Sequence, residues 1–179
     1  MADNNRVRLF ENTITITGKH ATYIKFLVNE AEIFDKYIDV YLCGAVVGYL
    51  YKVKAQRDNT STDRGRIEAD ALATHKQDCM FLYRLITLLD SSGLDSEEQV
   101  NRAFRYDSDI EKEETVKECL ENFNAYVRGG IERMYRDFTA GCINKDDYVR
   151  NSLLIAKNFK DELSNEVSYE ERLKEEILK

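Results

Sequence analysis

The sequence predicts a mainly α protein: a single-domain bundle of five to six helices with a short β-strand or hairpin near the N-terminus. Its 179 residues include no proline and only 8 glycines, so the strongest helix breaker is absent. Apolar residues recur at helical spacing from about residue 19 onward, whereas residues 6–17 alternate with a period of two. This length also suits one domain with a sizeable core.

The segment 6–17 is the predicted β element. Ile14 and Ile16 alternate with threonines over residues 13–17, and such β-branched alternation is typical of a strand. Residues 11–12 could form a tight turn, which would give a hairpin, and the alternative is a single bent strand. A hairpin alone is marginally stable in water, and the remaining sequence offers no obvious further strand. We therefore expect this element to pair across a subunit boundary.

Helices are expected over most of residues 19–165, the helical core, followed by a short charged tail helix at 168–179. The expected helical segments within the core are 19–32, 34–56, 66–90, 96–105, 109–139 and 144–163. Asp95, Ser108 and Asn144 are typical N-caps for the last three segments. The segment 34–56 is apolar around much of its circumference, so we expect it at the centre, packed against 66–90 and 109–139.

Glycines mark the expected helix contacts. Gly44 and Gly48 lie four residues apart, where they would leave a groove for another helix of the same chain. Gly129 and Gly130 interrupt the apolar stripe of the segment 109–139, although each costs about 1 kcal/mol relative to alanine in a helix interior. This cost predicts either a kink or a close helix crossing there.

Charge is distributed unevenly along the chain. The formal net charge is −7 and the pI is about 5.0, which weighs against a dedicated binder of duplex nucleic acid. Residues 1–66, however, contain 10 Lys and Arg against 8 Asp and Glu. Any contact with an anion should therefore use this first third. The candidate residues are Arg6, Arg8, Lys19, Lys52, Lys54, Arg57, Arg64 and Arg66.

Three residues are candidates for chemistry. His75 and Cys79 lie four apart on one helix face and could act as two metal ligands or as a base and a thiol. The only other histidine is His20, and no further ligand pattern accompanies the pair, so we interpret both as core residues. Asp39 precedes the most apolar stretch and could be a buried acid or base, but a partly buried ion pair is the simpler explanation. The sequence therefore predicts no catalytic, metal or cofactor site.

Tyrosines beside basic residues indicate an interaction surface. The chain contains 11 tyrosines and no tryptophan. Tyrosine and basic side chains serve protein interfaces and can also stack on single-stranded bases, and the acidity of the chain favours the protein interface. With the predicted β element, the candidate interaction residues are Val7, Leu9, Ile14, Ile16, Tyr49 and Tyr51.

The cysteines and the N-terminus suggest a location. Cys43, Cys79, Cys119 and Cys142 are widely spaced and include no CxxC pair, so we expect free thiols. The first residues lack the pattern of a signal peptide, and no apolar run reaches the roughly 20 residues that cross a membrane. We expect a cytoplasmic protein without a membrane partner.

Three functional hypotheses remain. The favoured one is a non-catalytic helical adaptor or accessory subunit that acts through protein–protein contacts, either with copies of itself or in a larger complex. The second is a nucleic-acid-associated accessory protein that uses the basic N-terminal third. The third is a small hydrolase or metalloenzyme centred on His75, Cys79 and Asp39.

Overall fold

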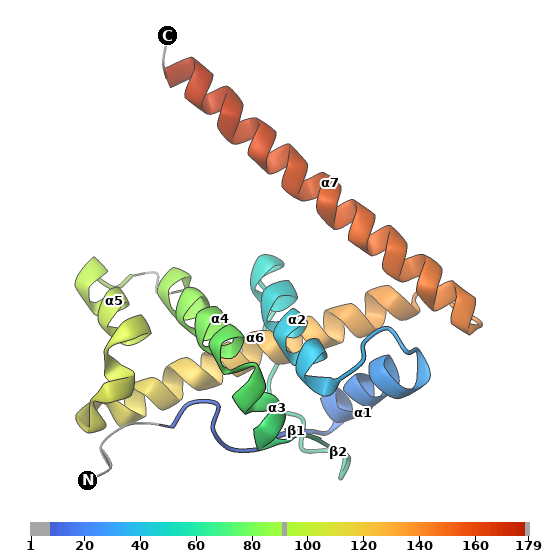
Figure 1. Cartoon of the computed structure of the whole chain (residues 1–179), viewed down its shortest axis with the longest axis horizontal. Helices are drawn as coiled ribbons and strands as arrows, with labels where there is room; N and C mark the ends of the chain where they lie inside the picture. Colours follow the sequence, from blue (N-terminus) through green and yellow to red (C-terminus); the bar gives the residue numbers. More distant parts are fainter. Residues whose placement is uncertain (1–7, 91–92, 178–179) are drawn as a thin grey trace. The chain divides into compact units, whose positions relative to one another are not determined.

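The computed structural model describes residues 8–90 and 93–177, with side chains up to residue 161 and at residue 164. It contains seven α-helices and a two-stranded antiparallel sheet in these residues, which confirms the mainly α class (Figure 1). The chain separates into two compact units, residues 1–135 and 136–179. The prediction of a single domain stays a prediction.

The first unit contains the sheet and most of the helices. In chain order its elements are β1 (Ile14–Thr17), α1 (Lys19–Lys25), the π-helical turn η1 (Phe26–Glu30), α2 (Tyr37–Leu50), β2 (Arg64–Ile67), α3 (Ala69–Thr74), α4 (Lys76–Leu89), α5 (Ser96–Phe104), the 3-10 turns η2 (Tyr106–Ser108) and η3 (Ile110–Lys112), and α6 (Glu113–Thr139), which continues into the second unit. Figure 1 shows α2 and α4 running across α6.

The sheet differs from the predicted β element. β1 pairs antiparallel with β2, so that Ile14 lies opposite Ile67 and Thr17 opposite Arg64. In the described part of this element, residues 8–17, no hairpin forms around residues 11–12. The expectation that the chain offers no further strand is wrong. β2 was expected to be a loop and the start of a helix. With only four residues, RGRI, it has two positions on its buried face, Gly65 and Ile67, too few to show a period of two.

Glycines bring α2 and α6 into backbone contact, which confirms the predicted packing of Gly44 and Gly48 within the chain and the close helix crossing at Gly130, while Gly129 packs against the segment after α2 at Val53 and Lys54. A Cβ atom added to Gly48 would lie 2.0 Å from the carbonyl oxygen of Tyr126. One added to Gly130 would lie 1.9 Å from the carbonyl oxygen of Gly44. Any side chain at Gly48 or Gly130 would force the two helices apart.

An aromatic cluster forms the centre of the first unit. The ring of Phe123 on α6 makes edge contacts with Phe10, Tyr41 and Tyr83, with centroids 5.9–6.0 Å apart. Val116, Val127, Ile131 and Met134 on the apolar stripe of α6 are buried with it. The apolar spacing of the segment 66–90 predicts one buried seam, formed by Leu72, His75, Cys79, Leu82, Ile86 and Leu89. This prediction is only partly correct, because Leu89 is 54 % exposed whereas Tyr83, outside the seam, is buried.

Asp90 connects three segments at the C-terminal end of α4. Its carboxylate accepts hydrogen bonds from Lys54 Nζ at 2.8 Å, Asn122 Nδ2 at 2.8 Å and the Tyr126 hydroxyl at 2.6 Å. Burial alone would raise the pKa of Asp90, but the three donors outweigh it and hold the pKa below its usual value. The ionised carboxylate thereby fixes the loop after α2 against α4 and α6.

The second unit is dominated by one helix, α7 (Lys145–Ile177). The Asn144 side chain accepts a hydrogen bond from the Asp147 amide at 3.1 Å, which confirms the predicted cap. The prediction of a separate tail helix at 168–179 is wrong within the described residues, because α7 continues without a break through this segment to Ile177. The helical spacing of Val149 and Leu153 in the segment 144–163 predicts that they face inward. They are instead 55 % and 66 % exposed, because no other element of the second unit covers them in the described residues.

Candidate protein-interaction site

An apolar groove lies between α4 and α5 in the first unit. Its volume is about 660 Å³. It is lined by Ala73 at the end of α3, by Lys76, Gln77, Met80, Phe81, Arg84, Leu85 and Leu88 on α4, and by Phe104 on α5. Six of these nine side chains are apolar, so water filling the groove gains few hydrogen bonds from it. The groove is therefore suited to an apolar ligand surface.

Large apolar side chains in and beside this groove are open to solvent. Phe81 is 63 % exposed, Leu85 36 % and Phe104 48 %. Leu89 and Val100 extend the same two helices with exposures of 54 % and 40 %. Residues 81, 85 and 89 are spaced by four, so they share one face of α4. Continuous exposed apolar faces of this kind are uncommon on monomeric proteins, and they often mark protein-interaction sites.

Polar contacts hold α5 and the following turn in place beside the groove. Asp95 caps α5 by accepting a hydrogen bond from the Glu98 amide at 2.8 Å, as its sequence position predicted. Hydrogen bonds from the Tyr106 hydroxyl and from Arg102 lower the pKa of Glu98 and keep it ionised. The walls of the groove are thus fixed while its apolar lining stays open.

Two basic side chains line the groove, and each is paired with an acid of the chain outside the lining. Lys76 and Arg84 are its two basic lining residues, and among the described residues no carboxylate lines it. Each of the two also contacts an acid of the chain outside the lining: Lys76 Nζ lies 2.7 Å from Glu11, and Arg84 lies 3.3 Å from Asp107. The Arg84 guanidinium also lies 5.6 Å from the centre of the Phe104 ring. A ligand with acidic side chains beside its apolar face would complement this lining.

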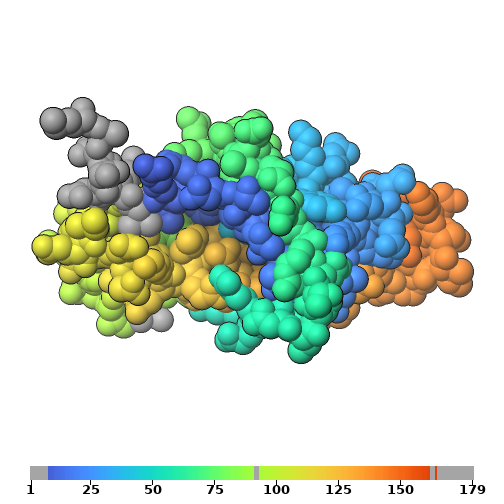
Figure 2. Space-filling model, turned by 90° about the horizontal axis from the view of Figure 1, so that it is seen from below, coloured from blue at the N-terminus to red at the C-terminus, as the bar shows by residue number. Residues whose placement is uncertain are grey.

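The structure places the predicted N-terminal interaction residues mainly in the core of the chain. Leu9 and Ile16 are 4 % and 7 % exposed, and Ile14 is half-buried. Figure 2 shows the first described residues crossing the face between α4 and α6, where the Phe10 ring contacts Tyr83 and Phe123. The edge of β1 that faces β2 is filled within the chain. Val7 lies outside the described residues.

The two tyrosines predicted for interaction lie at the end of α2, away from the groove. Tyr49 is half-buried and its ring contacts Tyr126, with centroids 5.5 Å apart, while Lys52 lies 3.4 Å from the ring centre. Tyr51 is 38 % exposed and the Arg133 guanidinium lies 4.0 Å from its ring centre. Their role in binding a partner stays a prediction.

Three of the eight basic candidates for anion contact are paired with acids of the same chain, and two more have other partners. Lys19 lies 2.9 Å from Glu132, Lys54 lies 2.8 Å from Asp90, and Arg57 lies 3.1 Å from Glu121. Arg64 donates to backbone carbonyl groups, and Lys52 lies over a tyrosine ring. Arg8 and Arg66 are exposed, and Arg6 lies outside the described residues. Binding a phosphate would require most of these cations to exchange a partner they already have.

The helix start after β1 is likewise occupied by an acid of the chain. Asp58 accepts a hydrogen bond from the Lys19 amide at 2.7 Å, the position that a bound phosphate would take. Hydrogen bonds from the Thr60 hydroxyl, from this amide and from the Thr60 amide lower the pKa of Asp58 to about 2. The segment 17–20 is therefore a structural turn.

The candidate residues for chemistry have structural surroundings. Burial raises the pKa of Cys79 to about 11, so the thiol stays protonated. His75 is not a core residue: it lies at the break between α3 and α4, where its Nδ1 atom is 3.3 Å from Asp78. The Asp39 carboxylate accepts the Lys36 amide at 3.1 Å and so caps α2. The described residues contain no group of three or more His, Cys, Asp or Glu that could hold a metal ion.

A buried histidine was missed by the sequence analysis. His20 is fully buried, and its Nε2 atom lies 2.8 Å from Glu132 Oε1. A carboxylate accepts hydrogen bonds, so we assign the proton to Nε2, which leaves Nδ1 as a buried acceptor without a partner in the described residues. Burial lowers the pKa of His20 despite the neighbouring acid. The two residues lie 112 positions apart, so no local pattern could reveal the contact.

Comparisons with known proteins do not assign a family. No protein-family model, curated protein or solved structure matches this chain. Within the described residues, no helix combines the length and the apolar character needed to cross a membrane. The function must therefore be inferred from the geometry of the groove and its surroundings.

Proposed function

We propose that this protein is a non-catalytic accessory subunit that holds an amphipathic helix of another protein in the α4–α5 groove. The observation that carries the proposal is the exposure of Phe81, Leu85 and Phe104 along one open groove. Binding an apolar helix face in such a groove is a recurrent mode of protein recognition, in which anchors at positions i, i+3 or i+4 and i+7 enter the groove.

The dimensions and charge of the groove define the partner. α4 has 14 residues and is therefore about 21 Å long, which accommodates about four turns of a helix packed along it. Lys76 and Arg84 favour acidic residues beside the apolar anchors of the partner. Removing Phe81 and Phe104 from water on binding would supply the main driving force, since exposed aromatic anchors dominate interface energetics.

Two further features support a non-catalytic role in the cytoplasm. The carboxylates of Asp39 and Asp58 accept hydrogen bonds from backbone amides at helix starts, and burial keeps the Cys79 thiol protonated. These three residues therefore have structural roles. All four cysteines are free thiols, which suits a reducing compartment.

Peptide binding tests the proposal directly. The probes are two fluorescently labelled helical peptides of about 16 residues, long enough to span the groove, with identical leucine anchors and either glutamate or lysine at the flanking positions. We expect the glutamate peptide to bind more tightly in fluorescence anisotropy and to weaken at high salt. Failure of both peptides to bind, or tighter binding of the lysine peptide, would contradict the proposed ligand.

Matched variants locate the binding. Phe81→Ser should weaken binding of the glutamate peptide about tenfold or more, the loss expected for a central aromatic anchor. Ile110→Ser is the control, because Ile110 is also a large exposed apolar residue, at 49 %, but does not line the groove. Both side chains are exposed, so neither change should unfold the protein. Equal affinities of the two variants would place the binding elsewhere.

A further inference from the structure

The helix α7 presents a second apolar surface. Its 33 residues run continuously from Lys145 to Ile177. Val149, Leu153 and Ala156 are spaced by four and three, so they form one stripe along the helix, and all three are exposed. Leu163 and Val167 continue the same spacing in the sequence.

Such a helix requires a partner surface. Helices in proteins gain most of their stability from packing an amphipathic face, because helical propensity alone is marginal in water. The stripe begins near the N-terminal end of α7 and its spacing extends over about five turns, a length typical of a helix that pairs with another long helix. A second copy of the same chain offers an identical stripe of equal length.

The charges of α7 favour one orientation of such a pair. Residues 145–160 contain four basic and two acidic side chains, whereas residues 161–177 contain two basic and seven acidic ones. Two antiparallel copies would place the basic half of each helix beside the acidic half of the other. Two parallel copies would place the acidic halves together, which is unfavourable.

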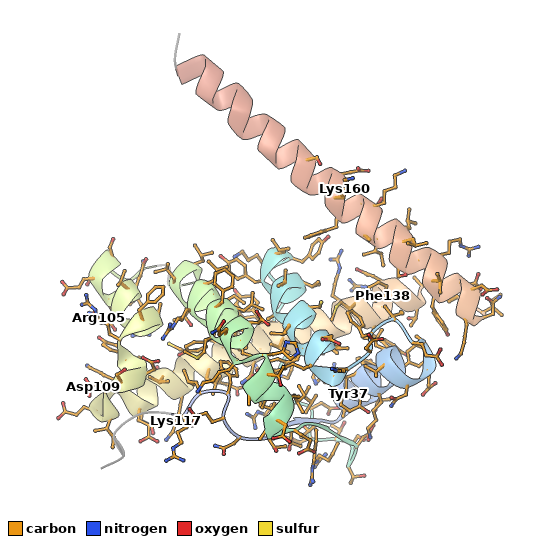
Figure 3. All side chains as sticks on the ribbon, in the orientation of Figure 1. Tyr37, Arg105, Asp109, Lys117, Phe138 and Lys160 are labelled. Carbon is orange, nitrogen blue, oxygen red and sulfur yellow. The ribbon has the colours of Figure 1, made fainter. Side chains whose placement is uncertain are left out.

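Lys160 lies on the apolar stripe near the centre of α7. It is labelled in Figure 3, and it follows Ala156 by four residues. In a pair centred near residue 161 the two Lys160 side chains would lie close together in either orientation, with Asp161 and Glu162 of the second copy beside them. The orientation is therefore inferred from the charges of the two halves of α7.

We propose that α7 joins two copies of this protein as an antiparallel helix pair, with Val149, Leu153 and Ala156 in the contact. The inference does not depend on the α4–α5 groove, since it uses only residues of the second unit. In such a dimer each chain keeps its own first unit, so the assembly would carry two grooves and could bind two partner helices at once.

The mass of the full-length protein tests the association. Light scattering after size exclusion should give twice the chain mass of 20.8 kDa at micromolar concentration. The double variant Val149→Ser with Leu153→Ser should be a monomer of unchanged helical content in the first unit. Asn158→Ala is the control, because position 158 lies on the opposite face of α7 from Val149, and it should remain dimeric. A monomeric wild type, or a dimer that persists in the double variant, would overturn the proposal.

Zero-length crosslinking of lysines to carboxylates tests the orientation. The experiment uses a mixture of ¹⁴N- and ¹⁵N-labelled full-length protein, so that links between copies are recognised by mass. We expect links between Lys145 of one copy and Glu175 or Glu176 of the other. Within one helix these positions are about 45 Å apart and cannot be joined. Links between copies that connect only nearby positions in the sequence would show a parallel pair and contradict the antiparallel arrangement.

Discussion

Gly48→Ala is the sharpest test of the α2–α6 crossing. The added Cβ would lie 2.0 Å from the Tyr126 carbonyl oxygen and 2.7 Å from its carbonyl carbon, whereas ordinary contacts are 3.4–4 Å. Both atoms belong to the backbone of α6, so no rotamer change can relieve the clash. The two helices must separate, and the aromatic cluster around Phe123, on the same helix, must repack.

The size of the effect follows from two opposing contributions. Overpacking a core costs about 1–3 kcal/mol, and a clash with rigid backbone should fall at the upper end. Replacing a helical glycine by alanine stabilises the folded state by about 1 kcal/mol, because alanine has the higher helix propensity. We therefore expect Gly48→Ala to lower the free energy of unfolding by about 2 kcal/mol, a large part of the 5–15 kcal/mol typical of a domain.

Gly44→Ala provides the matched comparison. Its Cβ would meet the Val127 carbonyl oxygen at 2.9 Å, a milder conflict, and it gains the same helix propensity. Urea unfolding followed by circular dichroism should give similar free energies of unfolding for the wild type and Gly44→Ala and a clearly lower value for Gly48→Ala. The dependence of the free energy on urea concentration should be similar in all three. A Gly48→Ala protein as stable as the wild type, or less affected than Gly44→Ala, would refute the assignment of this crossing.

Three other predictions concern the core and its buried polar groups. Phe123→Ala should cost about 3–5 kcal/mol in urea unfolding because it empties the aromatic cluster, while Leu82→Ala, at a half-buried position, should cost less; equal losses would show that the cluster is not the centre of the core. Asp90→Asn should destabilise the protein by about 2 kcal/mol at pH 7. Because the pKa of Asp90 is lowered on folding, the contribution of its carboxylate to the free energy of unfolding should be lost as the pH falls below about 4. A variant with the same acid sensitivity as the wild type would contradict this. The pKa of His20 is also lowered, so the stability contributed by the neutral imidazole is full above pH 6.5 and decreases as the pH falls from 6.5 towards the folded-state pKa. The free energy of unfolding of His20→Gln should therefore change less than that of the wild type between pH 7.5 and 5. Parallel curves of stability against pH would argue against the buried neutral form.

The long periodic segments were predictable from sequence. The segment 109–139 corresponds to α6, because its apolar stripe repeats over about six turns and outweighs the cost of Gly129 and Gly130. The caps Asp95 and Asn144 were also recognisable, since capping depends on residues three apart. Such features are local, so the sequence around them contains the whole signal.

The remaining features depend on contacts between distant segments. β2 has too few residues to show a strand pattern and is held by its pairing with β1, about 50 positions earlier. The groove was not predicted, because the apolar spacing of α4 indicates a buried face that includes Leu89. In the structure Leu89 is exposed, and Tyr83 packs on Phe123 instead. Which face of α4 is covered is decided by the approach of α6 and the N-terminal segment, and the spacing of α4 alone does not contain that information.

The most direct test of the central claim is site-specific photocrosslinking at position 81 in the cell that produces the protein. A photoreactive phenylalanine analogue replaces Phe81, and a second protein carries it at Asn59, an exposed loop position outside the groove, as the control. We predict one dominant crosslinked protein for position 81, with the attachment point mapped by mass spectrometry to an amphipathic helix flanked by acidic residues. The crosslink should disappear when Phe104→Glu is added. No crosslinked species beyond those of position 59, or attachment to a segment without that pattern, would contradict the proposal that this groove binds a partner helix.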